Sequence, residues 1–452
     1  MQYQRIKLER SFYKTFFSMY IVLVLQNIVT LSVNLADNMM LGGYAEVSLS
    51  GVAAVNQIQF VYQQLLAALG DGLVILCSQY WGKRQTGPMK KIASSAMHAG
   101  LLICFLLFGL VSLFPYQVMG LFTTDQAIIA EGVRYLRIIR FTYPFFAVTQ
   151  ILLATLRSVE MVKIAFILSV QTFFINCGIN FVLIYGRFGA PELGTAGAAI
   201  GTLAARIVET AVLICYIAKK EKILHLRPKD YLKTDRLLRR DYLKITMPIA
   251  VVQGLWGLNT AMQTVILGHM TSAAIAANSV ASTLFLLVKS IPVGAASTTS
   301  VLIGKKIGEG DLNMVKNYAV VLQKMFVVIG VISGMLLFGL RGPVLSLYRL
   351  SDATREMANA FLLVLCVITV TMSYQMPTNI GIIRGGGSPM FVVKMDLISI
   401  WCIVIPLSFF MAFVVKASPV VVVCCLNADQ VFKCIPAFLK VNYGSWIKKL
   451  TR

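Results

Sequence analysis

The stretch Ser32-Val33-Asn34-Leu35-Ala36-Asp37-Asn38-Met39-Met40-Leu41-Gly42-Gly43 closes an apolar run that opens at Phe16. It places the carboxyl group of Asp37 inside a segment that otherwise has the composition of a membrane-spanning helix. A carboxylate at that depth is costly and is usually paired or functional. The alternative is that Asp37 lies near the helix end, where it reaches the interface and has no special role. The rest of the chain decides between these interpretations.

The composition identifies an integral membrane protein. Of the 452 residues, 58% are hydrophobic and only 13% are charged, a balance that a water-soluble globular protein of this size does not show. The net charge of +22 is compatible with nucleic-acid binding, but the Lys and Arg residues fall in short connectors between apolar runs, where they set topology. We therefore expect membrane lipids, and no nucleic acid, among the partners.

Apolar runs recur along the whole sequence and predict an all-α protein with twelve transmembrane helices. The first run is too long for the core of a signal peptide and lacks a small-residue cleavage site, so we expect it to be retained as the first span. The expected spans cover residues 13–40, 48–80, 88–113, 125–156, 161–187, 195–219, 241–268, 272–303, 312–341, 352–383, 388–416 and 419–439.

The basic residues predict the orientation. Lys and Arg gather in the N-terminal tail, the even-numbered connectors and the C-terminal tail, which predicts a multi-pass protein of the plasma (inner) membrane with both termini in the cytoplasm. Arg134, Arg137 and Arg140 run against this pattern, because they open the fourth span from the outer side. Their spacing places them on one helix face, and the sequence assigns them no role.

The longest connector is strongly basic and divides the chain into two halves of six spans. Its composition is typical of a solvated cytoplasmic linker near anionic lipid. The expected domains are a cytoplasmic N-terminal tail (1–12), an N-lobe (13–219), the linker (220–240), a C-lobe (241–439) and a cytoplasmic C-terminal tail (440–452).

Sequence matches at a constant offset indicate that the two halves are repeats. Leu41-Gly42, for example, corresponds to Leu267-Gly268. An even number of spans in each half makes the repeats parallel, with a central cavity between two lobes as the natural transport site. The same offset takes Asp37 to Gln263, so the second half carries an amide where the first carries an acid. An acid that the fold required would appear in both halves, so we expect a functional Asp37.

Three neutral polar residues are candidate partners of Asp37. Asn176 and Asn180 lie four residues apart, on one face of the expected fifth span, and Thr202 lies in the sixth. Carboxylate, amide and hydroxyl oxygens are hard ligands of the kind that Na⁺ accepts, which predicts a coupling-cation site at these residues. Burial also disfavours an ionised carboxyl group, so Asp37 could carry a proton instead. The alternative for the two Asn residues is ordinary hydrogen bonding between helices.

Other intramembrane charges are weaker candidates. Asp71, in the second span, either contacts substrate or faces an aqueous cavity without a coupling role. Lys289, Lys394 and Asp396 are similar, and Asp396 pairs either near Lys394 or with another span.

The sequence shows no enzymatic motif. The nine Cys residues have no C-x-x-C pair and the three His residues are scattered, so we expect neither a disulfide framework nor a metal site built from them. No paired acids stand at catalytic spacing, and no Gly-rich phosphate loop is present. We expect a protein that is not an enzyme and that uses no cofactor beyond a coupling ion.

Several motifs, in their order and spacing, resemble those of the multidrug and toxic compound extrusion (MATE) transporters. They are Ala36-Asp37 with Leu41-Gly42, Gln79-Tyr80-Trp81-Gly82-Lys83, Asn176-x-x-x-Asn180 with Leu183-Ile184-Tyr185-Gly186, Gly194-x-Ala196-Gly197-Ala198-Ala199, Ile303-Gly304-Lys305-Lys306-Ile307-Gly308, Arg384-Gly385-Gly386-Gly387 and Trp446-Ile447-Lys448-Lys449-Leu450. The resemblance extends from about residue 13 to the C-terminus.

The resemblance implies a two-lobed, twelve-helix, monomeric antiporter of the MOP superfamily, which expels small amphipathic, often cationic compounds in exchange for Na⁺ or H⁺. The N-lobe cation site of the family is similar, position by position, to Asp37, Asn176, Asn180 and Thr202. Some members have a second acid in place of Asn180, and others carry Glu in place of Trp256. We therefore place coupling in the N-lobe. The substrate cavity is expected to include Asp71, Gln263 and Trp256.

Two questions stay open at this point. The coupling ion is H⁺ or Na⁺, with a slight preference for H⁺, because Asn180 in place of a second acid lowers the negative charge that would hold a metal cation. The alternative function is that of a lipid-linked oligosaccharide or lipid flippase of the same superfamily, which shares the two-lobed plan.

Overall fold

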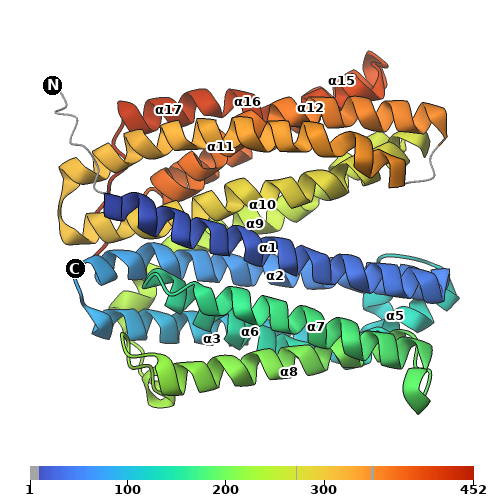
Figure 1. The fold of residues 1–452 in the computed structure, drawn as a ribbon, viewed down its shortest axis with the longest axis horizontal. Coiled ribbons are helices and arrows are strands. Elements are labelled where there is room, and N and C mark those ends of the chain that lie inside the picture. The colour runs from blue at the N-terminus through green and yellow to red at the C-terminus, as the bar shows by residue number, and fades with distance from the viewer. Residues whose placement is uncertain (1–9, 271, 348–350, 452) are drawn as a thin grey trace. The chain divides into compact units, whose positions relative to one another are not determined.

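The structure, a computed structural model, describes residues 10–270, 272–347 and 351–451. Residues 1–9 of the expected N-terminal tail lie outside the described residues. Within the described ranges the chain is helical and contains no strand. The expected all-α fold is confirmed, because helices lie at the position of every expected span (Figure 1).

Most of these helices are able to cross a membrane. Among the described residues, ten helical segments are long and apolar enough, and an eleventh span results when the bent pair α5 (Gln126–Ile139) and α6 (Thr142–Ser158) is counted as one. The expected seventh span is α9 (Arg236–Gly268), which is 33 residues long. Its length is sufficient, but polar residues such as Gln253, Asn259 and Gln263 make it less apolar than the other spans.

The chain forms two compact units. The N-unit comprises Leu25–Cys77 and Gln85–Ala250, and the C-unit comprises the described parts of Met1–Val24, Ser78–Arg84 and Val251–Arg452. Three of the four boundaries between the units fall inside helices, namely α1 (Arg10–Tyr44), α2 (Glu46–Gly82) and α9, and the fourth falls between Arg84 and Gln85, in the turn after α2. The division into lobes 13–219 and 241–439 that the sequence predicts stays a prediction.

The remaining N-unit helices follow the expected spans closely. They are α3 (Thr86–Leu113), α4 (Pro115–Gly120), α5 (Gln126–Ile139), α6 (Thr142–Ser158), α7 (Lys163–Tyr185) and α8 (Thr195–Lys220), with short 3₁₀ turns at Arg187–Gly189 and Pro228–Leu232. The expected span 125–156 is two helices, α5 and α6, bent by 54°. Pro144 explains the bend, because a proline ring clashes with the carbonyl group four residues earlier, here that of Arg140.

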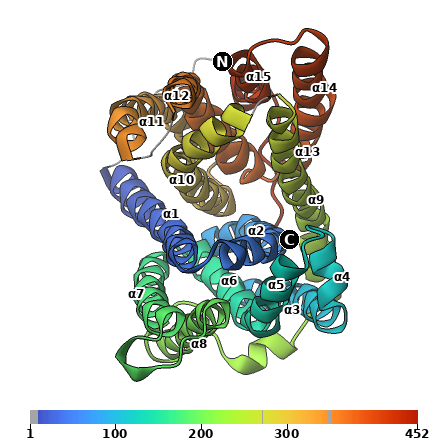
Figure 2. The same cartoon turned by 90° about the vertical axis from the view of Figure 1, so that its right-hand side faces the viewer.

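Two glycines of α8 bring it against α7, and both ribbon views show these helices side by side (Figures 1 and 2). A Cβ atom at Gly197 would lie 2.7 Å from the backbone carbonyl of Leu183, and one at Gly201 would overlap the side-chain oxygen of Asn180. Only glycine permits so close an approach. The packing of α7 on α8 therefore fixes where Asn180 points.

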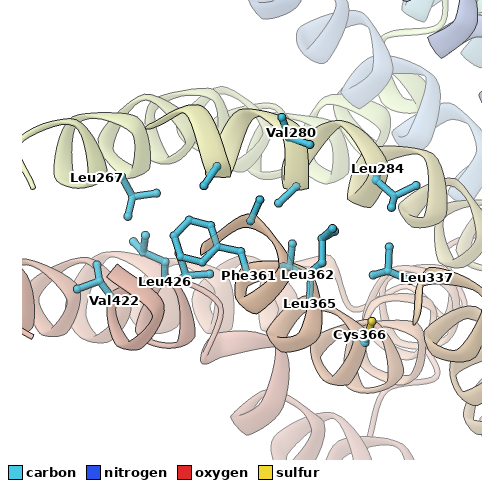
Figure 3. Close-up of a cluster of buried hydrophobic side chains, with 14 of the residues drawn as sticks. Leu267, Val280, Leu284, Leu337, Phe361, Leu362, Leu365, Cys366, Val422 and Leu426 are labelled. Carbon is cyan, nitrogen blue, oxygen red and sulfur yellow. The ribbon is translucent and has the colours of Figure 1, made fainter. Parts of the chain in front are cut away.

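The C-unit is built around three long helices. Its elements are α10 (Ser272–Glu309), α11 (Leu312–Leu347), α12 (Asp352–Met376), α13 (Pro389–Leu397), α14 (Ile405–Phe409), α15 (Pro419–Leu426), α16 (Asp429–Phe432) and α17 (Cys434–Asn442). In its apolar core, Val280 and Leu284 of α10 lie opposite Phe361 and Leu362 of α12, and the last two side chains are fully buried (Figure 3).

The last three spans of the C-unit are irregular. π-Helical segments occupy Pro377–Arg384, Ile398–Val404 and Phe410–Val414. The expected span 419–439 is broken into α15, α16 and α17, with a turn at Asn427 and Ala428. π-Helices are rare and occur often at functional sites, and broken helices at membrane depth line binding sites in many transporters.

The connector 220–240 packs against α3. The ammonium group of Lys90 lies 3.0 Å from the Asp230 carboxylate, and that of Lys91 lies 3.2 Å from Asp235. The Ser94 hydroxyl donates a hydrogen bond of 2.7 Å to the backbone carbonyl of Tyr231. The sequence predicted a solvated linker, but the structure holds its middle on the N-unit.

The two carboxylates of this connector are stabilised in their ionised form. Burial opposes ionisation of Asp230, but hydrogen bonds from the Lys90 ammonium and the Arg227 backbone N–H hold its pKa below the usual value. The pKa of Asp235 is lowered by the backbone N–H of Leu238 and by the Lys91 ammonium. The contact between connector and α3 therefore depends on two ionised carboxylates.

The C-terminal tail is extended and attached to the rest of the C-unit. The Gln79 side chain donates to the Lys448 carbonyl (3.0 Å) and accepts from the Leu450 backbone N–H (2.8 Å). The Lys448 N–H donates to the Gly386 carbonyl at 2.8 Å. Because Gln79 is fully buried, both hydrogen bonds of its amide group are shielded from solvent.

Candidate coupling site

Hydrogen bonds join all of the residues that the sequence predicts for the coupling site. Asn180 Nδ2 donates to Asp37 Oδ1 at 2.7 Å and lies 3.4 Å from Asn176 Oδ1. Asn176 Nδ2 donates to Thr202 Oγ1 at 3.1 Å. The chain Thr202–Asn176–Asn180–Asp37 thus crosses from α8 through α7 to α1. The structure brings these residues together, and their role in coupling stays a prediction.

The two Asn residues are held in place by helix geometry and burial. They lie one turn apart on α7 and are 1% and 0% exposed, whereas Asp37 on α1 is only partly buried. The Asn180 side-chain oxygen faces Gly201 of α8, so its NH₂ group is turned toward Asp37. A hydrogen bond to a carboxylate contributes about 1.5–3 kcal/mol, and it favours one fixed orientation of the acid.

Asp37 faces a small polar cavity inside the N-unit. Its volume is about 50 Å³, enough for a few water molecules. The polar side chains around it come from five helices and include Asn34, Asp37, Gln59, Tyr135, Thr202 and Arg206.

Several buried polar atoms of this region have no partner among the described residues. They are Gln59 Nε2 and Tyr143 Oη, both at the cavity, and Asn180 Oδ1 beside Gly201. Tyr143 is only 1% exposed. Buried polar groups are normally hydrogen-bonded to protein or ordered water, so the cavity has the character of a hydrated pocket.

An ion pair at the cavity was not predicted from the sequence. Arg206 Nη1 lies 2.6 Å from Glu209 Oε2, and both side chains are largely buried, 19% and 6% exposed. The guanidinium group lies 4.9 Å from the Phe146 ring centroid and lines the same cavity as Asp37. The signal was available, because opposite charges three residues apart inside the apolar run 195–219 predict an intramembrane ion pair.

The residues predicted for the substrate cavity do not line this pocket. Asp71 of α2 pairs with Arg157 of α6 at 3.3 Å. Trp256 of α9 stacks under Lys289, with the ammonium 4.2 Å from the ring centroid, and Gln263 is partly buried. Their assignment to a substrate cavity stays a prediction.

Of the three Arg residues predicted on one helix face, Arg134 in α5 and Arg140, which directly follows α5, make different contacts. Arg134 lies 3.8 Å from Glu131 on the surface, a contact that contributes little. Arg140 lies over the rings of Phe108 and Phe141, at 5.6 and 5.1 Å. Neither residue lines the cavity at Asp37.

The sequence of this chain matches a known protein family. A family model described as MatE matches residues 23–182 and 248–410. These ranges cover more than half of the chain and include Asp37, Asn176 and Asn180.

The similar curated proteins are bacterial and cover most of the chain. A probable multidrug resistance protein NorM of Streptococcus pneumoniae (strain ATCC BAA-255 / R6) is 23% identical over 398 residues, which are 87% of this chain and 86% of the relative. The probable multidrug resistance protein YoeA of Bacillus subtilis (strain 168) is 24% identical over 407 residues, 88% and 87% of the two chains.

Solved structures with the same fold are similar over almost the full length. A MATE structure in the straight conformation has a TM-score of 0.86 at 16% identity, covering 95% of each chain. The eukaryotic MATE transporter AtDTX14 has a TM-score of 0.82 at 17% identity and covers 96% of each chain. Because the sequence identities are low, this similarity concerns the fold alone, which is the twelve-helix fold of these transporters.

Proposed function

Because this chain belongs to the MatE family, we propose that it is a secondary active multidrug efflux antiporter that exports small amphipathic, often cationic organic compounds in exchange for H⁺ or Na⁺. Its relatives carry names of multidrug resistance proteins, which supports the substrate class. The observation that carries the coupling mechanism is the hydrogen-bonded carboxyl group of Asp37 at a polar cavity.

Asp37 acts as the ion carrier in this proposal. Its carboxylate is negative when empty, and it then attracts the Asn180 amide and the Arg206 guanidinium across the cavity. Uptake of a proton or metal cation neutralises the carboxylate and weakens both attractions. Because Asn180 and Arg206 belong to α7 and α8, the change in charge alters the packing of these helices against α1. Ion uptake and helix movement are thereby linked, as antiport requires.

The arrangement of donors favours H⁺ as the coupling ion. A Na⁺ site needs several oxygen atoms that converge on one point. Here the NH₂ group of Asn180 faces Asp37, and the NH₂ group of Asn176 faces Thr202. Donors beside a carboxyl group suit an acid that gains and loses a proton, and they leave few oxygens free for a metal ion.

Further features of the proposal concern the cell. We place the protein in the plasma (inner) membrane as a monomer with both termini in the cytoplasm, in line with the distribution of Lys and Arg. The 13–219 and 241–439 lobes would enclose a substrate cavity that includes Asp71, Gln263 and Trp256.

The test is efflux of a fluorescent cationic dye from proteoliposomes given either a pH gradient or a Na⁺ gradient alone. We expect the pH gradient to drive efflux and Asp37→Asn to abolish it while the variant still binds dye. Asp125→Asn is the matched control, because Asn caps the α5 N-terminus as well as Asp does. Efflux by Asp37→Asn at the wild-type rate would refute the role of Asp37.

The same vesicles separate the alternatives. Efflux driven by Na⁺ at fixed pH, with none from the pH gradient, would replace H⁺ by Na⁺ as the coupling ion. Transfer of a labelled lipid headgroup between leaflets, without dye efflux, would indicate a flippase instead.

A further inference from the structure

The C-unit contains a buried ion cluster that the proposed coupling mechanism does not use. The ammonium group of Lys433 lies 2.8 Å from Asp396 Oδ1 and 2.9 Å from Asp429 Oδ2. The side chains of Lys433, Asp429 and Asp396 are 4%, 7% and 24% exposed. At these distances the ammonium group forms a charge-assisted hydrogen bond with each of the two carboxylates.

Three amide side chains extend the cluster into the unit. Gln430 donates to Asp429 at 2.8 Å, Gln375 donates to Gln430 at 2.7 Å, and Asn379 donates to Gln375 at 2.9 Å. The far end of this chain is Asn379 Oδ1, a buried acceptor without a hydrogen-bond partner among the described residues, on a side chain that is 2% exposed. The cluster therefore offers more oxygen atoms than its own donors satisfy.

The backbone is irregular where these residues lie. Asn379 is in the π-helical segment Pro377–Arg384, Asp396 lies in the last turn of α13, two residues before the segment Ile398–Val404, and Asp429 begins α16 just after the break in the last span. Asp429 and Lys433 are four residues apart, as are Gln375 and Asn379, so each pair shares one helix face. Asp396, from α13, brings a second carboxylate to the same ammonium group.

We propose that these residues form a second cation site, which Lys433 fills as a covalently attached cation. The site sets the two carboxylates of Asp396 and Asp429 against the ammonium group of Lys433. Without Lys433 both carboxylates lose this partner, and a small monovalent cation such as Na⁺ is able to take its place. Under the proposed antiport function, a permanently filled site in the C-unit leaves ion exchange to Asp37.

The test removes the attached cation and supplies a free one. Lys433→Met leaves both carboxylates without their principal partner, which strongly destabilises a buried pair. We expect the thermal midpoint of this variant to rise when NaCl replaces choline chloride at equal ionic strength. The wild type should not respond in this way. In equilibrium binding of radioactive Na⁺, the variant should gain one site per chain relative to wild type.

The matched control is the neutral triple variant Asp396→Asn/Asp429→Asn/Lys433→Met. It keeps similar side-chain volumes without charge, so it should fold without Na⁺ and gain no Na⁺ site. An equal Na⁺ response in the triple variant would overturn the proposal, because the effect would then not depend on the carboxylates. Absence of any Na⁺ response in folded Lys433→Met would overturn it as well.

A milder variant keeps the test decisive if Lys433→Met does not fold. Asp396→Asn/Lys433→Met leaves only Asp429, with Gln430 still donating to it, so a single carboxylate has lost its cation. Stabilisation of this variant by Na⁺ would support the site, and an unchanged midpoint would refute it. All of these readouts are independent of transport, so failure of the efflux tests at Asp37 does not bear on them.

Discussion

Replacing Gly201 by alanine adds one methyl group at the point where α8 approaches Asn180 of α7. An ideal Cβ atom there would overlap the Asn180 side-chain oxygen. Either the helices separate or the amide turns away, and both movements lengthen the 2.7 Å bond from Asn180 to Asp37. Overpacking costs about 1–3 kcal/mol, and loss of a hydrogen bond to a charged group costs about 1.5–3 kcal/mol.

The expected result is a less stable protein with altered coupling. Since about 1.4 kcal/mol corresponds to a factor of ten in an equilibrium constant, loss of the Asn180 bond should change the ion affinity of Asp37 by tenfold or more. The measurement is the thermal midpoint together with the pH dependence of dye efflux in proteoliposomes.

Gly178→Ala is the internal control for this prediction. Gly178 lies on α7 between Asn176 and Asn180, and a Cβ atom there would meet nothing within 4 Å. Alanine in a helix interior is more stable than glycine by about 0.5–1 kcal/mol, so this variant should be slightly stabilised and transport normally. Equal behaviour of Gly201→Ala and Gly178→Ala would refute the view that α8 sets the position of Asn180.

Two further predictions concern the ends of the helices. Gln79→Ala removes the partners of a Lys448 carbonyl and a Leu450 N–H, each of which costs about 1–3 kcal/mol when left unpaired. Limited proteolysis should therefore release the C-terminal tail faster than in a Gln85→Ala control, and equal rates would contradict this. The pKa values of Asp230 and Asp235 are lowered in the folded protein, so their contribution is complete above the ordinary Asp pKa of about 3.9 and is lost as the pH falls below it. The rate of amide hydrogen exchange in residues 220–240 should rise on such acidification. The double variant Asp230→Asn/Asp235→Asn should show fast exchange already at neutral pH. Wild-type exchange protection that does not change with pH would contradict the assignment.

The sequence predicted that Asp37, Asn176, Asn180 and Thr202 lie together, because polar residues are conspicuous in apolar runs. Asn176 and Asn180 share a helix face by their spacing alone, and the structure places them beside Asp37 and Thr202. Arg206 was missed although its spacing from Glu209 carried the same signal. The charges of Arg206 and Glu209 add to zero, and the two residues leave the rest of the span apolar, so they did not stand out.

The C-unit cluster was harder to predict, for a physical reason. The sequence left open whether Asp396 pairs near Lys394 or with another span, and the structure shows that its partner is Lys433. That contact depends on how α13 packs against the last span, which local spacing does not encode. The break of the last span at Asn427 was also not predicted, because no proline or glycine stands at the turn.

The two polar clusters use similar groups and differ in what neutralises the acid. In the N-unit, Asp37 accepts a hydrogen bond from a neutral amide at a polar cavity, and Arg206, which is paired with Glu209, acts on Asp37 across that cavity. We propose that an ion from solution neutralises this carboxylate. In the C-unit, Lys433 supplies a positive charge to Asp396 and Asp429 from within the chain. An attached cation cannot leave during a transport cycle, so under the two proposals this cluster stays neutralised, whereas the charge at Asp37 changes each time an ion enters or leaves.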